Sequence, residues 1–129
     1  MSVVAASASS HLPRTAPIEG YGKGGFRFAG MSHRGSLLCL PSGIWAWPVA
    51  TPEDITEDTL APVFAASGEI KLFLIGAGRA GWAMPEPLLW QFREHKIAVE
   101  VSRTGTAVST YNILLGEGRP CAAGLIAVE

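Results

Sequence analysis

The chain has 129 residues, a formal net charge of −1, 48% hydrophobic residues and 16% charged residues. This length fits one domain, and the composition excludes a disordered chain, which requires low hydrophobicity and high charge. The near-zero charge and the scattered arginines argue against nucleic acid as a partner.

The first segment, residues 1–16, is rich in alanine and serine. It lacks the basic start and the sustained apolar stretch of a signal peptide. We therefore predict a disordered tail at 1–16 and a single domain at 17–129. No apolar run approaches the ~18 residues that span a bilayer. The sequence thus predicts a cytoplasmic protein without direct membrane insertion, although a peripheral place on a membrane complex stays open.

Four short segments at residues 18–21, 26–28, 36–40 and 44–47 alternate with glycine- and proline-containing turns. They predict an N-terminal antiparallel β-meander, with a break at residues 31–35. A helix follows within residues 51–67. Thr56 is its expected N-cap, and Gly68 is its expected terminator.

The most strongly patterned part of the chain is a predicted strand–helix–strand unit at residues 69–101. Its first strand ends in a continuous apolar run, which is typical of a strand covered on both faces. Pro85 and Pro87 suit the start of the following helix. A last helix, capped by Thr104 and ended by Gly116, precedes a closing strand at residues 119–128. The predicted fold is α/β: one layered domain with a mixed central sheet, the N-terminal meander and about three helices.

Cys39 and Cys121 each lie in an apolar stretch, so we expect two buried free thiols rather than a disulfide. The chain has no C-x-x-C pair, which argues against structural zinc. His33 and His95 lack metal-ligand spacing. We therefore expect no metal site, no cofactor and no catalytic residue.

Residues 76–81 form a literal G-x-G-x-x-G that follows a strand, and Glu100 lies nineteen residues further on. This pattern suggests a dinucleotide site. Trp82 and the two prolines follow the motif, so the next helix begins several residues after it. The N-terminus of that helix is then not in place to bind the pyrophosphate. The chain is also short for two mononucleotide-binding halves. A structural turn is the favoured interpretation, and a site for a small anion or another ligand stays open.

Several segments together resemble a known family. They are residues 18–22, 74–78 and 101–107, then Ser109-Thr110-Tyr111-Asn112-Ile113-Leu114, Glu117-Gly118-Arg119 and the alanine-rich closing strand. Their order and spacing are similar to those of the Mth-type domain family of unknown function. Its relatives include the mitochondrial complex I assembly factor 3 and an adipogenesis-associated Mth-domain protein. The resemblance covers about residues 17–128.

This resemblance implies a layered α/β fold without an established enzymatic activity. It also implies a role in binding other proteins. The leading hypothesis is therefore a non-enzymatic protein-binding module, such as an assembly factor for a respiratory or membrane complex. Its partner is an unidentified protein, and a homo-oligomer is a further alternative.

The competing hypothesis is a small-molecule or nucleotide-binding protein with a shallow pocket between two strand ends. Its candidate residues are Gly76, Gly78, Arg103, Thr104, Thr110, Tyr111, Asn112 and Glu117. Each also has an ordinary structural role available, such as a helix cap or a hydrogen bond to a loop.

Tryptophan is enriched at the energetic centres of protein interfaces. Trp82 and Trp90 are the candidate partner surface, with ordinary core packing as the alternative. Trp45 and Trp47 are expected to share one face of a strand.

Overall fold

The computed structural model describes residues 11–129, so the predicted tail at residues 1–10 lies outside the described part. Residues 11–16, which the sequence also assigned to the tail, instead contact the domain. Leu12 forms an antiparallel bridge with Ile44, and Ala16 is buried. The packed chain thus begins before Pro17. This short segment pairs with a distant strand, and such a pairing leaves no periodic pattern in the sequence.

The first five strands follow one another through short turns but belong to two sheets. β1 (Ile18–Gly22), β2 (Gly25–Phe28) and β3 (Met31–Arg34) form a three-stranded antiparallel sheet. β4 (Ser36–Leu40) and β5 (Gly43–Trp47) belong to a five-stranded sheet of order β5-β4-β8-β6-β7. The predicted meander is therefore confirmed as antiparallel, and it is divided between the two sheets.

The break that was predicted at residues 31–35 is wrong, because most of it is strand β3. Three of the four β3 side chains are exposed and His33 is half-buried, so the strand carries no apolar alternation. Gly35, with a φ of +98°, turns the chain from β3 into β4. A positive φ of this kind is readily adopted by glycine.

The second half of the chain alternates helices and strands. Its elements are η1 (Pro52–Asp54), α2 (Glu57–Ala65), η2 (Ser67–Glu69), β6 (Leu72–Gly76), α3 (Glu86–Glu94), β7 (Ala98–Ser102), α4 (Thr104–Gly116) and β8 (Cys121–Leu125). β6 runs parallel to both β7 and β8, and β8 runs antiparallel to β4. The central sheet is therefore mixed, which confirms the predicted α/β fold class.

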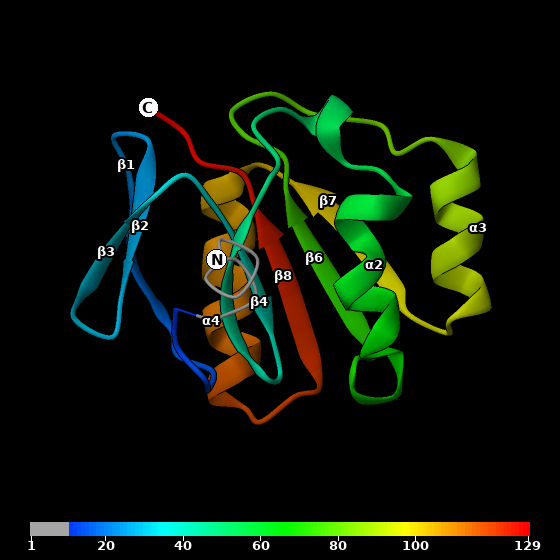
Figure 1. Cartoon of the computed structure of the whole chain (residues 1–129), viewed down its shortest axis with the longest axis horizontal. Helices are drawn as coiled ribbons and strands as arrows, with labels where there is room; N and C mark the ends of the chain where they lie inside the picture. Colours follow the sequence, from blue (N-terminus) through cyan, green and yellow to red (C-terminus); the bar gives the residue numbers. More distant parts are fainter. Residues whose placement is uncertain (1–10) are drawn as a thin grey trace, which may run out of the picture.

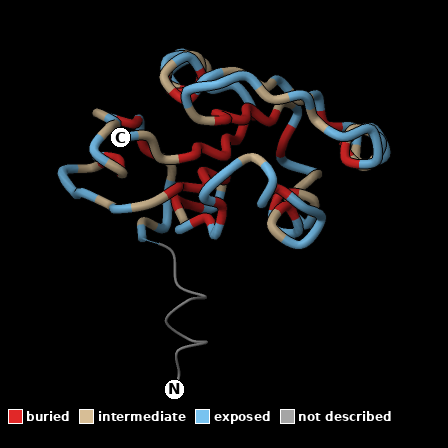
Figure 2. The backbone as a smooth tube through the Cα atoms, turned by 90° about the horizontal axis from the view of Figure 1, so that it is seen from above, coloured by how far each residue is buried: buried red, intermediate tan, exposed pale blue. Residues whose placement is uncertain are grey.

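The five-stranded sheet lies between two layers (Figure 1). Helices α2 and α3 cover one face, where Leu60, Phe92 and Phe73 belong to one buried cluster. Helix α4 and the three-stranded sheet cover the other face, where Tyr111 and Phe28 belong to a second cluster. Figure 2 shows the buried residues concentrated along the strands between these layers.

The residues that were predicted to start and end α2 are partly confirmed. Thr56 is its N-cap, and its side chain accepts a hydrogen bond from the Thr59 N–H. The helix ends at Ala65, however, and Gly68 lies in the separate 3₁₀ turn η2. The prediction that Gly68 terminates the helix is wrong. The chain tightens into a 3₁₀ turn here, as helix C-termini often do.

The glycines of residues 76–81 have different structural roles. A Cβ on Gly76 would lie 2.9 Å from the Thr104 Cα and 3.2 Å from the Ala107 Cβ, so this glycine lets β6 pack closely against α4. Gly78 has a φ of +97°. Gly81 is exposed, and a Cβ there would meet nothing within 4 Å. Helix α3 begins at Glu86, so it does not follow the motif directly.

Both cysteines are free and buried, as predicted. Burial, together with the nearby Cys121, raises the pKa of the Cys39 thiol from 9.0 to about 12. Burial, together with the nearby Cys39 and Cys121, also raises the pKa of Tyr111. Both groups are therefore neutral at physiological pH and belong to the core behind α4.

The Cys39 thiol gives the stability a predictable pH dependence. Its pKa is raised in the folded state, so its contribution is complete below the unfolded-state pKa of about 9 and is lost as pH rises towards 12. We expect the free energy of unfolding to fall between pH 9 and about 10 with a slope of up to about 1.4 kcal/mol per pH unit. Urea titrations of the wild type and Cys39→Ala measure this slope. Equal slopes in the two proteins would contradict it.

The packing of β6 on α4 predicts that Gly76→Ala and Gly81→Ala differ. Gly76→Ala places a methyl group against the α4 backbone, and we expect it to lower the free energy of unfolding by about 1–3 kcal/mol. Gly81→Ala is the matched control, and we expect a change within about 0.5 kcal/mol. Urea denaturation measures both. If the two substitutions cost the same, Gly76 does not set this close approach.

Candidate functional site

A pocket of about 440 Å³ lies where the carboxyl ends of β6 and β7 meet the first turns of α4. We call it the glycine-loop pocket. Its lining residues come from β1, from the loop after β6, from α4 and from the C-terminal segment: Tyr21, Gly78, Arg79, Arg103, Thr104, Gly105, Thr106, Ser109 and Val128. Open α/β sheets commonly bind ligands at such an edge.

The buried hydroxyl of Thr104 fixes the pocket floor. It donates to the Ile126 carbonyl at 2.7 Å and accepts from the Gly78 N–H at 3.0 Å. The Thr104 N–H in turn donates to the Gly78 carbonyl at 3.0 Å. Thr104 therefore holds the glycine loop and the C-terminal segment together. It is the first residue of α4 rather than its N-cap, which is Arg103; the predicted capping role of Thr104 is wrong.

The pocket mouth is electropositive. Arg103 is the N-cap of α4 and makes no side-chain capping bond. The N–H groups of Gly105 and Thr106 have no partner within residues 11–129. The positive end of the helix dipole therefore faces the same opening as Arg79 and Arg103. Arg79 donates to the Glu129 backbone oxygen. This arrangement suits a small anion.

The eight residues that the sequence placed around one pocket divide in the structure. Gly78, Arg103 and Thr104 line the pocket, and Gly76 is buried beneath it. Thr110, Tyr111, Asn112 and Glu117 are not among the lining residues. They lie on later turns of α4 or beyond its end, and each helical turn carries the chain about 5.4 Å away.

Three of these four residues have clear structural roles. Tyr111 is 1% exposed and packs in the core. The Asn112 amide bonds both backbone groups of Ile18, at 2.8 and 2.9 Å, and so ties α4 to β1. Glu117 pairs with Arg119 on the surface. Thr110 is half-buried.

The sequence did not identify Tyr21, Arg79, Gly105, Thr106, Ser109 or Val128 as pocket residues. Thr106 and Ser109 are three residues apart on one helix, so a face-by-face analysis of α4 could have found them. Tyr21 comes from a separate sheet, and its ring lies against Gly105. This long-range contact leaves no local pattern.

The candidate tryptophan pair separates in the structure. Trp90 lies on α3 with 55% of its surface exposed, and the Arg93 guanidinium lies 5.0 Å from the centre of its ring. Trp82 is half-buried against the core cluster beneath α2 and α3. Trp90 is therefore exposed and Trp82 packs against the core, and the proposal that the two form a partner surface stays a prediction.

The two histidines that the sequence singled out lie on different elements. Burial and the nearby His11 lower the pKa of His33, whose Nε2 is 3.2 Å from the Ser36 carbonyl oxygen. His95 stacks on Phe64 with 4.5 Å between ring centres. Within the described part of the chain, no three His, Cys, Asp or Glu residues lie close enough together to hold a metal ion. Across residues 11–129, no helix has the length and apolarity to cross a membrane.

Curated relatives align with most of the chain. The mouse "NADH dehydrogenase [ubiquinone] 1 alpha subcomplex assembly factor 3" is 32% identical over 91% of this chain and 63% of its own length. The human protein of that name is 33% identical over 84% of this chain and 59% of its own length. The chain thus spans less than two-thirds of these relatives. An uncharacterized Rhodobacter capsulatus protein is 36% identical over 85% of this chain and 83% of its own length.

Solved structures share the whole fold. A crystal structure titled as an outer membrane protein of Bartonella henselae is 45% identical and has a TM-score of 0.89; 92% of this chain and 100% of that chain are covered. An NMR structure from Rhodopseudomonas palustris is 47% identical, with a TM-score of 0.82 over 95% and 90% of the two chains. A Bordetella pertussis Mth938-like domain is 24% identical, with a TM-score of 0.75 over 87% and 85%, and shows the fold alone.

The model of one protein family matches residues 18–126, which are nearly all of the described chain. The match begins at β1 and ends just after β8, so it includes both sheets and every lining residue of the glycine-loop pocket except Val128. These findings confirm the resemblance to the Mth-type domain family with complex I assembly factor relatives. The chain belongs to the family described as "Protein of unknown function (DUF498/DUF598)".

Proposed function

We propose that the chain is a non-enzymatic protein-binding module that assists the assembly of a respiratory membrane complex. The observation that carries this proposal is the likeness to proteins named as assembly factors of NADH dehydrogenase, which extends over 91% of this chain for the mouse protein. The module acts from the cytoplasm, at the periphery of the membrane complex, and its partners are subunits of that complex.

The surface of α3 supports a binding role. Trp90 exposes more than half of its surface there. Its neighbours Glu86, Pro87, Arg93 and Glu94 are also exposed. A large aromatic group surrounded by polar residues is the usual composition of an interface centre and its rim.

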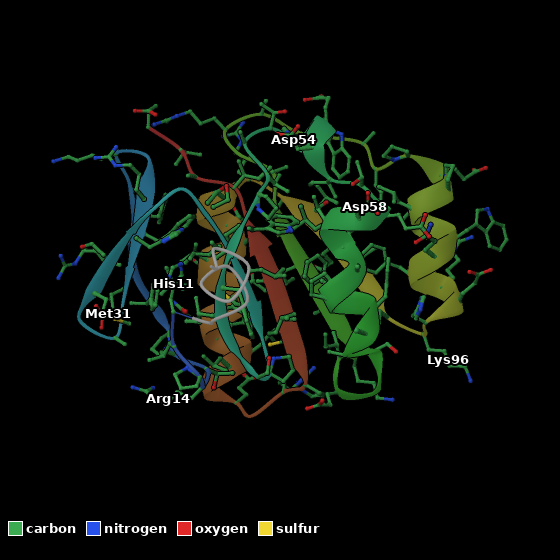
Figure 3. The ribbon with its side chains drawn as sticks, viewed as in Figure 1. His11, Arg14, Met31, Asp54, Asp58 and Lys96 are labelled. Carbon is green, nitrogen blue, oxygen red and sulfur yellow. The ribbon has the colours of Figure 1, made fainter. Side chains whose placement is uncertain are left out.

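Helix α4 offers a second surface, which is uncharged. It contains no charged residue from Thr104 to Gly116, and Ile113 is 61% exposed on it. Two other residues lie at the surface away from α4. Met31 is exposed at the outer end of the β2–β3 hairpin, and Lys96 lies beyond the last turn of α3 (Figure 3). Light scattering decides whether a second copy of the chain covers α4, which is the homo-oligomer alternative.

The assembly role predicts that Trp90→Ala weakens partner recovery without unfolding the chain. We expect the wild type to co-purify with subunits of NADH dehydrogenase from detergent-solubilised host membranes. Recovery should fall by about tenfold for Trp90→Ala, as expected for an interface centre. Glu94→Ala, on the same helix, is the control. Circular dichroism melting checks that both variants fold.

The same role has a cellular consequence. A host strain that lacks the chain should contain less assembled NADH dehydrogenase on native gels, and the wild-type chain should restore it. Normal assembly in the deletion strain, together with repeated failure to recover a subunit, would contradict the proposal.

A small-molecule or nucleotide-binding function is the second candidate, and the electropositive glycine-loop pocket favours it. If it is correct, a thermal-shift screen of phosphate, nucleotides and dinucleotides should raise the melting temperature of the wild type. Arg103→Ala should remove the rise, whereas Arg27→Ala, on β2 and not among the lining residues, should keep it. A screen without any stabilising compound would count against this function.

A further inference from the structure

A groove of about 540 Å³ separates strand β5 from helix α2 on the face of the sheet opposite the glycine-loop pocket. We call it the β5–α2 groove. Leu38, Leu40 and Trp47 form its apolar base, and Pro62, Ala65 and Ala66 line its helical side. Its volume lies within the range of known ligand sites, about 300–1,000 Å³.

One wall of the groove contains an unpaired hydrogen-bond donor. The Trp45 Nε1 is inaccessible to solvent and has no partner among residues 11–129. Its neighbour Trp47 differs, because the Trp47 Nε1 donates to the Thr59 carbonyl at 2.9 Å. A buried donor without an acceptor costs about 1–3 kcal/mol. A hydrogen-bond acceptor on a bound molecule would remove this cost. Because the Trp45 Nε1 makes no hydrogen bond among residues 11–129, its indole can turn towards such an acceptor without breaking one.

The same wall is the outer edge of the central sheet. Ile44 directs its N–H and C=O away from β4, because both groups bond to residues 11 and 12. Orientation alternates along a strand, so the backbone groups of Ala46 point outward in the same way. Ala46 is exposed, and its outward N–H and C=O have no partner in the part of the chain that the structure describes. They can bond to the backbone of an extended peptide.

The opposite wall is negatively charged. Asp58 and Glu69 line the groove, and no lysine, arginine or histidine does. Pro62 has no N–H, so the Asp58 carbonyl four residues earlier lacks its helical donor. Figure 3 labels Asp58 on α2, in front of the sheet. The C-terminal end of the same helix adds the negative end of its dipole. This wall therefore attracts a cationic side chain.

We infer that the β5–α2 groove binds an extended peptide segment of a protein partner, with an apolar side chain flanked by lysine or arginine. The apolar side chain fills the groove between Trp45 and Pro62. A peptide carbonyl accepts from the Trp45 indole, and a basic residue lies beside Asp58 or Glu69, which lie near opposite ends of α2. This inference rests on the proposed protein-binding function and specifies the chemistry of one partner segment.

The test uses the full chain and a phage-displayed library of random twelve-residue peptides as the probe. Ala65→Arg places a large cation in the groove. Ala61→Arg, one turn earlier on α2, is exposed and does not line the groove. We expect the selected peptides to contain an apolar residue next to Lys or Arg. They should bind Ala65→Arg at least about tenfold more weakly than Ala61→Arg. Added salt should weaken binding to the wild type.

NMR of the indole N–H groups locates the binding directly. The chain has four tryptophans, and Trp45→Phe assigns the signal of Trp45. Saturation with a selected peptide should move the Trp45 signal downfield, because its N–H gains an acceptor. The Trp47 N–H is already bonded and should move less. Peptides that shift the Trp90 signal instead would overturn the groove site while leaving the protein-binding function intact.

Other results separate the remaining occupants. If the Trp45 signal of the free chain moves on dilution, the groove binds a second copy of the chain. If it moves when residues 1–10 are removed, the groove binds the chain's own terminus. Either result overturns the inference, as would a library that yields no peptide sensitive to Ala65→Arg. If peptides bind the groove but the host membranes yield no partner, the assembly role fails and the groove site remains.

Discussion

The arrangement of the whole domain depends on the position of β8, the last strand, in the middle of the central sheet. All five residues from Cys121 to Leu125 are buried. β8 pairs in antiparallel fashion with β4 and in parallel with β6. It therefore joins the hairpin half of the chain to the half in which helices and strands alternate. Without it, β4–β5 and β6–β7 would be separate two-stranded units, which are marginally stable in water.

The small residues of β8 make this position possible. A Cβ on Gly124 would lie 2.6 Å from the Trp47 ring and 3.0 Å from Phe73, so both aromatic rings pack directly on the strand. The chain beyond β8 then fixes the glycine loop, because the Ile126 N–H donates to the Gly76 carbonyl and the Ile126 carbonyl accepts from Thr104. The same strand thus shapes the core, the base of the β5–α2 groove and the glycine-loop pocket.

The parts of the fold that the sequence predicted correctly have strong local signals. The apolar run of β6, the capping residue Thr56 and the end of α4 at Gly116 all follow from neighbouring residues. The parts that the sequence did not predict depend on contacts between residues far apart in the chain. β3 exposes most of its side chains and is a strand because it pairs with β2. Leu12 joins the domain through Ile44, more than thirty positions away.

The candidate site shows the same difference between residues with local signals and residues that depend on distant contacts. Gly78, Arg103 and Thr104 were identified because they lie at strand ends and at a helix start. Tyr111 and Asn112 were placed in the pocket, but they lie further along α4, where Tyr111 packs in the core and Asn112 bonds to the distant Ile18. The Trp45 indole without an acceptor and the outward edge of Ala46 become visible only once the sheet order is known. The β5–α2 groove therefore arises from tertiary structure, whereas Trp90 on α3 was a candidate from the sequence.

Hydrogen–deuterium exchange of the chain, alone and in the complex recovered from host membranes, tests the central claim of protein binding most directly. The account predicts that the complex slows exchange in β5 around Ala46 and in α3 around Trp90, while the loop at residues 77–85 stays unchanged. Slowed exchange confined to that loop and to the first turn of α4 would contradict it, and would instead indicate a ligand-binding protein.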